Sequence, residues 1–384
     1  MAWNRRSPEV AQAPMPPSMA RWSVALVIAV LIGVLLFLLY AALPSLQVLN
    51  VWLLCASPVV AVGLAFAGRA YGHGGALSRF ESQQATAREA QDAWQRWGQR
   101  GMAVLGTCLL LPDQVSASSV AQGGQALPPR TGQARRLDGL PAKCDARVQA
   151  GIDQLLATLA ASLTVLPAAQ TLNVTLLTDI PPADYPAAQA HWQQGWARLK
   201  TPLEPARVSL AAALSPHWIE ETLKTASTAV ELIVVLQVNG EAAYSDGLAA
   251  LLLCPDALAE KHAWSRTATW LRPMPLQAGP LEQEFALFLQ TQASAREATG
   301  LLADRADWLP LNGRLLAAST GEGALEPTAQ TITETLSGVP GPLGHWLVAV
   351  LGIELTRHRQ QPLLLLTQDG TQHWISTITT KESV

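Results

Sequence analysis

Charge is missing from a long stretch near the start of this chain. Between Trp22 and Gly68 there is no Asp, Glu, Lys or Arg. About 20 apolar residues cross the roughly 30 Å hydrocarbon core of a bilayer, so this stretch is long enough to cross it twice. Because neither crossing would carry an ionisable side chain, we expect no ion pathway or proton relay through these segments.

Helix-breaking and polar residues interrupt the charge-free stretch between Leu43 and Asn50. The sequence therefore predicts a transmembrane helical hairpin over 22–68, with one span near 24–43 and the other near 48–67. The connecting turn carries no charge, whereas arginines flank both outer ends: Arg5, Arg6 and Arg21 before the first span, and Arg69, Arg79 and Arg88 after the second. The positive-inside rule then places the tail (1–21) and everything after the hairpin on the cytoplasmic face of a bacterial inner membrane, as a multi-pass protein in the lipid bilayer.

Cysteine patterns and catalytic signatures are also scarce. The four cysteines contain no CxxC pair, and no two of the seven histidines stand at a ligand spacing on one predicted face. There is no GxSxG, no HExxH and no phosphate-loop lysine motif. The net charge is −3 without any basic block, so the electrostatic footprint of nucleic-acid binding is absent. We therefore expect no metal, no cofactor, no nucleic-acid partner and no small-molecule substrate.

The chain after the hairpin alternates apolar strands with helices. A polar, helix-prone connecting segment (69–100) leads into a first half (101–260), and a stretch of loop composition follows at 113–145. The strands expected in this half lie at 102–111, 171–178, 206–213, 230–238 and 247–254, and the helices at 146–166, at 184–200 and from 215 onward. Such alternation favours crossover connections and a largely parallel sheet that is covered on both faces.

The second half (261–384) continues this pattern less regularly. Its expected strands lie at 267–275, 313–318, 362–368 and 371–379, and its expected helices at 281–297, 327–336 and 345–359. Asp369-Gly370 between two β-rich runs is typical of a hairpin turn. Both halves thus end with a helix that leads into a β-hairpin, at 215–254 and at 345–379, which indicates a pseudo-repeat.

Two α/β halves of this kind resemble the thiolase or β-ketoacyl-synthase-like fold. The segment 244–253 (YSDGLAALLL) is similar to the strand that ends the first half of the synthases, and the hairpin 362–379 is similar to the one that ends their second half. The resemblance implies a mixed-sheet α/β domain over roughly 100–380. It also implies a cysteine nucleophile at a helix start after the third strand, with two histidines, or His and Asn, from the second half.

This chain departs from that catalytic pattern. The corresponding turn, 213–218, reads ALSPHW and has no cysteine. Ser215 and His217 are better explained as the opening of a helix, because serine is a preferred capping residue. If the protein is an acyl transferase or hydrolase, Ser215 or Cys254 would be the nucleophile, with His217 or His345 as its base. The first interpretation, however, is a pseudoenzyme.

A membrane-anchored pseudoenzyme of this class is similar to the adaptor proteins associated with type VI secretion loci. The sequence thus favours a non-catalytic adaptor or structural component that binds a protein partner. Two tryptophan pairs are candidates for the partner surface, because Trp is enriched at interface hot spots: Trp94 with Trp97, and Trp192 with Trp196. Core packing on one helix face would also explain such pairs. In a third hypothesis, the hairpin itself is the binding element of a membrane complex.

Overall fold

The computed structural model describes residues 3, 12–43, 50–122, 128–319 and 330–380. The chain divides into two compact units. One unit comprises residues 5–93, which contain the predicted membrane hairpin. The other combines residues 1–4 with residues 94–384 and contains the α/β domain.

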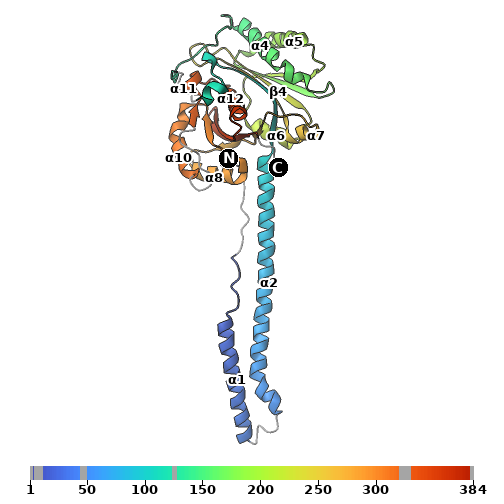
Figure 1. Ribbon diagram of the computed structural model, residues 1–384, viewed down its shortest axis with the longest axis vertical. Coiled ribbons are helices and arrows are strands. Elements are labelled where there is room, and N and C mark those ends of the chain that lie inside the picture. The colour runs from blue at the N-terminus through green and yellow to red at the C-terminus, as the bar shows by residue number, and fades with distance from the viewer. Residues whose placement is uncertain (1–2, 4–11, 44–49, 123–127, 320–329, 381–384) are drawn as a thin grey trace. The chain divides into compact units, whose positions relative to one another are not determined.

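The first unit contains one helix, and all but the last six residues of a second, that are long and apolar enough to cross a membrane, judged by length and composition. These are α1 (Met19–Ala42) and α2 (Val51–Gln99), whose 18-residue windows have mean hydropathies of 3.1 and 2.0. The helices approach closely at Gly33, where a side chain would clash with the carbonyl oxygen of Cys55. Most of the predicted turn at 43–50 lies outside the described residues. Helix α2 runs without interruption from Val51 to Gln99 (Figure 1).

The first half of the domain contains every strand that the sequence predicted there, with slightly different ends. Its elements are β1 (Gly101–Leu110), α3 (Ala117–Ala121), α4 (Cys144–Thr164), β2 (Leu172–Thr178), α5 (Tyr185–Arg198), β3 (Pro205–Ala211), α6 (His217–Lys224), β4 (Val230–Gln237), β5 (Gly247–Pro255) and α7 (Asp256–Lys261). These strands were predictable because each is a dense apolar run between turn residues. The predicted loop at 113–145 contains the short helix α3 and the start of α4.

The second half differs more from its prediction. Its elements are β6 (Ala268–Leu271), β7 (Met274–Leu276), α8 (Leu281–Thr291), α9 (Ala293–Arg296), β8 (Gly300–Ala303), α10 (Leu309–Ser319), β9 (Gln330–Ile332), α11 (Glu334–Ser337), α12 (Gly344–Arg359), β10 (Leu363–Asp369) and β11 (Gln372–Thr379). The strand predicted at 313–318 is wrong, because those residues belong to α10. The helix predicted at 327–336 is wrong at β9 and right only at its end, where α11 begins; its first residues lie outside the described part of the chain. Strand β8 was not predicted.

The two halves have the same strand order. From the outer edge inward they run β3-β2-β4-β5-β1 and β9-β8-β10-β11-β6, while β7 pairs with β11 off this path. With β7 left out of the count, both halves read third, second, fourth, fifth, first. In each half the fifth strand is antiparallel to its neighbours, and β1 pairs with β6 to join the halves. The predicted pseudo-repeat is therefore confirmed. The expectation of a largely parallel sheet is wrong in the centre, where these antiparallel pairs lie.

Alternating side chains of the strands feed three separate hydrophobic cores. In β4, Ile233 and Val235 enter a central core, whereas Val234 faces a core covered by α4 and α5. In β10, Leu365 also enters the central core, whereas Leu364 faces a core covered by α8 and α10. Helices α6 and α12 lie in the central core, between the two half-sheets (Figure 1). The period of two along each strand thus produces five layers, α/β/α/β/α.

Candidate functional site

Helices α6 and α12 are equivalent in the two halves, since each precedes the closing hairpin of its half. Their N-terminal ends meet in the central core. Trp346 Nε1 donates a 2.7 Å hydrogen bond to the carbonyl oxygen of Leu214, and His345 Nε2 lies 3.0 Å from the same oxygen. The resemblance to ketosynthases implied a nucleophile at the start of α6. We therefore take the α6–α12 junction as the candidate site.

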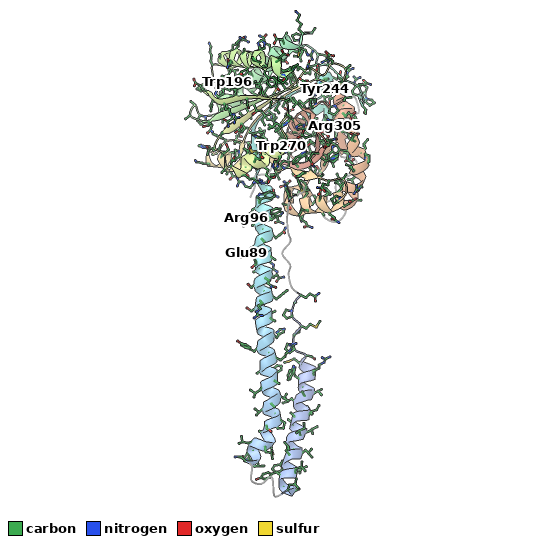
Figure 2. The ribbon with its side chains drawn as sticks, turned by 180° about the vertical axis from the view of Figure 1, so that it is seen from behind. Glu89, Arg96, Trp196, Tyr244, Trp270 and Arg305 are labelled. Atoms are coloured by element: carbon green, nitrogen blue, oxygen red, sulfur yellow. The ribbon has the colours of Figure 1, made fainter. Side chains whose placement is uncertain are left out.

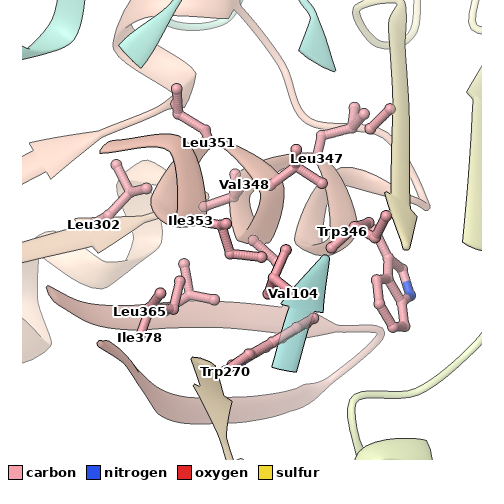
Figure 3. Packing of buried hydrophobic residues seen from close by; sticks show 14 of the residues in the cluster. Val104, Trp270, Leu302, Trp346, Leu347, Val348, Leu351, Ile353, Leu365 and Ile378 are labelled. Atoms are coloured by element: carbon pink, nitrogen blue, oxygen red, sulfur yellow. The ribbon is translucent and has the colours of Figure 1, made fainter. Parts of the chain in front are cut away.

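Indole rings fill the junction. Trp346 packs edge-on against Trp270, with ring centroids 5.4 Å apart, and against Trp218 at 6.2 Å. Trp270 is buried on β6, and its Nε1 donates to the Ser376 hydroxyl at 2.9 Å. Figure 3 shows Trp270 and Trp346 among the aliphatic side chains of the same core. Both buried indole N–H groups thus have partners, and aromatic contacts stabilise the closed packing.

The predicted Ser–His pair is not joined through its side chains. Ser215 Oγ accepts a weak hydrogen bond of 3.4 Å from the backbone N–H of His217. The ring of His217 is half-exposed and faces Glu220 and Glu221 on its own helix, at 3.5 and 3.7 Å. The N-cap residue of α6 is Pro216 and no side chain caps this helix, so the expected capping role of Ser215 is wrong and its hydroxyl makes only this local contact.

Burial sets the protonation of the other two candidates. His345 is 3% exposed, and burial lowers its pKa, so its ring stays neutral at neutral pH. Because that neutral ring lies against the Leu214 carbonyl, its Nε2 carries the proton. Cys254 is fully buried on β5, and burial raises its pKa to about 12. A thiol in this state is a poor nucleophile. Cys254 also lies opposite Ala103 on β1, on the face covered by α4 and α5.

Two equivalent aspartates, which the sequence motifs did not predict, follow β2 and β8. Asp179 accepts hydrogen bonds from the backbone N–H groups of Val238 and Asn239, after β4. Asp304 accepts one from the N–H of Gln368, at the same position on β10, and another from Trp308 Nε1. Burial raises the pKa of both carboxyls, that of Asp304 to about 6. The available signal was the repeated segment LLTD at 176–179 and LLAD at 301–304.

A buried ion cluster ties the 130–137 segment to both halves. Asp246, at the start of β5, is fully buried and pairs with Arg136 and Arg147. Its carboxylate also accepts the backbone N–H of Leu137 at 2.9 Å. In the second half, the N–H of Val339 donates to the Gln133 carbonyl at 3.0 Å. Removing one partner of such a buried pair strands the other charge, so this cluster fixes the segment in place.

The space near the junction is small. A cavity of about 20 Å³ lies at the N-terminal end of α12, lined by Asp246, Asp304, Thr333 and Ser337 among others. It has room for about one water molecule. A wider groove of about 580 Å³, lined by Trp264 and neighbouring residues, shares no residue with the junction. Among the described residues, no group of three His, Cys, Asp or Glu side chains could hold a metal ion.

The four candidate tryptophans for partner binding all contact the domain's own cores. Trp192 is 1% exposed and stacks on Trp196, whose Nε1 donates to the Leu203 carbonyl. Figure 2 labels Trp196 on the α/β domain. Trp94 and Trp97 stack on each other at 4.5 Å near the end of α2, beside the core under α8. A role for these residues in partner binding stays a prediction.

Comparisons with known proteins identify the fold. No protein-family model matches the chain, and no curated protein does. Among solved structures, the ketosynthase domain OzmH KS8 of Streptomyces albus JA3453 aligns with a TM-score of 0.51 and 14% identity, covering 73% of this chain and 96% of that one. The ketosynthase complex AntDE:AntF, with a type II PKS acyl-carrier protein, aligns with a TM-score of 0.51 and 13% identity, covering 74% and 100%.

The α/β domain therefore has the thiolase-like fold of ketosynthases, as the sequence predicted. At these identities the similarity concerns the fold alone. The two matches say nothing of a type VI secretion adaptor, so that part of the expected resemblance stays a prediction.

Proposed function

We propose that this protein is a membrane-anchored, non-catalytic adaptor whose ketosynthase-like domain binds a protein partner at the cytoplasmic face of a bacterial inner membrane. The observation that carries the proposal is the packing of the α6–α12 junction. There the Leu214 carbonyl is bonded to Trp346, and indoles occupy the space beside the helix start. These rings leave little room for an acyl chain in the central core beside the start of α6.

The anchor supports the membrane part of the proposal. Helices α1 and α2 have the length and hydropathy of spans, and their described side chains are mostly exposed. Exposed apolar helices are expected where lipid replaces water as the solvent. The arginines outside both spans favour a cytoplasmic domain. A secretion system is one assembly that such an adaptor would serve.

The test is purification of the tagged full-length protein from native membranes, with mass spectrometry of the proteins that accompany it. Secretion-system or envelope components in stoichiometric amounts are the expected result. A bait that returns alone, as a monomer or homo-oligomer, would count against the adaptor. The single variant Trp196→Ala, which leaves the buried Trp192 unchanged, tests whether Trp196 contributes to capture of the partner.

A second candidate function is acyl transfer or hydrolysis. It is favoured by the fold and by the place of Ser215, at the helix start where the resemblance implies a nucleophile, next to the carbonyl that contacts His345. Turnover of acyl thioesters by the purified protein, lost in Ser215→Ala and kept in the exposed-serine control Ser118→Ala, would establish it. Equal background rates in all three proteins would remove this candidate.

A further inference from the structure

The N-terminal tail contributes a side chain to the core of the α/β domain. Trp3 is only 7% exposed, although it precedes both apolar helices in the chain. Its ring meets Trp97 edge-on, with centroids 5.1 Å apart, and stacks on Phe288 at 5.8 Å. Trp3 therefore belongs to the same compact unit as residues 94–384.

The residues that receive Trp3 are themselves held firmly. Trp97 is stacked on Trp94, and the Arg272 guanidinium lies 4.7 Å from the centroid of its ring. Arg272 Nε also donates to the Trp97 carbonyl at 3.0 Å, and Trp94 Nε1 donates to the Thr291 hydroxyl at 2.9 Å. These contacts join the end of α2 to α8 and to the residue that follows β6. We call Trp97 and Phe288, the two rings that contact Trp3, the aromatic socket.

The chain is long enough to close on this socket. Residues 4–18 separate Trp3 from α1 and span up to about 50 Å when extended. The part of α2 between the charge-free stretch and Trp94, residues 69–93, is about 38 Å long at 1.5 Å per residue. The extended tail is therefore longer than this part of α2, so Trp3 can reach the socket from the start of α1. The closure entropy of such a loop grows only slowly with its length, whereas a buried indole removes about 150–250 Å² from water.

We propose that the aromatic socket is a docking site for the chain's own N-terminus and that Trp3 is a latch. In the latched state the domain holds the chain both before the first apolar helix and after the second. The latch restrains rotation of the domain about the end of α2. It also requires the N-terminus and the domain to lie on the same side of the membrane. Release of Trp3 exposes the faces of Trp97 and Phe288.

The experiment is hydrogen–deuterium exchange of the full-length protein in lipid nanodiscs, comparing wild type with Trp3→Ala. Trp3→Phe serves as the conservative variant, and Met15→Ala, at a tail position that is 86% exposed, as the matched control. We expect exchange in α8 to accelerate about tenfold or more in Trp3→Ala, to be largely restored in Trp3→Phe and to be unchanged in Met15→Ala. Exchange in α4, on the far core, should not change in any variant.

Three results would overturn the latch. The first is an unchanged α8 in Trp3→Ala. The second is protection of α8 that falls when the wild type is diluted, which would assign the socket to Trp3 of a second copy. The third is labelling of an N-terminal tag and of the domain from opposite sides of sealed vesicles. None of these results depends on whether the protein is an adaptor.

Discussion

At the scale of single residues, Asp304 links stability to pH. Burial raises its pKa to about 6, so the folded protein holds this proton more tightly than the unfolded chain does. Its stabilising contribution is complete below about pH 4 and is lost as the pH rises through about 6. The shift of about two units corresponds to about 3 kcal/mol. We predict that Asp304→Asn gains stability relative to wild type, by up to this amount, between pH 4 and pH 7.

The measurement is thermal unfolding of both proteins in the same detergent across that pH range. A stability difference that is the same at every pH comes from the altered hydrogen bonds to Gln368 and Trp308. Only the part of the difference that changes with pH reports the titration of the Asp304 carboxyl. Other buried acids titrate identically in both chains. A difference that does not vary with pH would show that Asp304 does not titrate in this range.

Gly338 presents a second residue-scale prediction. Its φ is +85°, and a side chain there would overlap the Gln133 carbonyl oxygen, on the segment that bridges the two halves. Gly370 also has a positive φ, of +58°, but has open space around it. Gly370→Ala is therefore expected to cost about 1–2 kcal/mol from backbone strain alone. Gly338→Ala should cost clearly more, as a lower unfolding temperature, and equal losses would contradict the steric argument.

At the scale of elements, the sequence predicted strands well where apolar runs were long. Strand β4 is a continuous run bounded by turn residues, and it appears as predicted. Strand β8 has only four residues, Gly300–Ala303, and no local pattern separates so short a run from a loop. The segment 313–318 contains Leu315 and Leu316, a short apolar pattern that fits strand or helix equally. It is helical because Leu315 packs into the core under α8.

The candidate site was predictable only in part, for a related reason. The turn at 213–218 could be located from the strand that precedes it and the helix that follows. The hydrogen bond that closes the site could not be predicted, because Leu214 and Trp346 are 132 residues apart in the chain. Element order indicated the pseudo-repeat, but the side chains that meet across it depend on how the two half-sheets pack, which no local pattern gives. The equivalence of Asp179 and Asp304 did leave a local signal, the repeated LLTD and LLAD segments, but the backbone N–H groups that these carboxyls accept from are far away in the chain.

Packing between α6 and α12 gives the element-scale prediction. Trp346→Ala removes a fully buried indole from the central core and should cost about 3–5 kcal/mol. Trp346→Phe keeps most of the volume but loses the hydrogen bond to Leu214, whose carbonyl still contacts His345, and should cost about 1 kcal/mol beyond the change in packing. Thermal unfolding of the three proteins checks this order. Similar stability of the alanine variant and wild type would mean that the indole does not fill the junction.

At the scale of the whole molecule, the proposed function assigns membrane attachment to one compact unit and recognition to the other. The described side chains of α1 and α2 include many exposed apolar groups, whereas few large apolar side chains of the α/β domain are exposed. A strongly exposed apolar patch marks many binding surfaces. Outside the candidate tryptophans, the domain's partner surface is thus expected to be polar, and a polar interface depends on shape and hydrogen bonding.

Exchange of the hairpin distinguishes the adaptor from a complex held together by its spans. We predict that replacing residues 22–68 by an unrelated two-span hairpin leaves partner capture from native membranes unchanged, because recognition then belongs to the α/β domain. The exchanged protein must show the same hydrogen exchange in α4 and α12 as the wild type, which verifies that the domain is intact. With that control satisfied, loss of the partner would assign recognition to the apolar helices. Small residues such as Gly33, which already permit close helix contact, would then be the first positions to substitute.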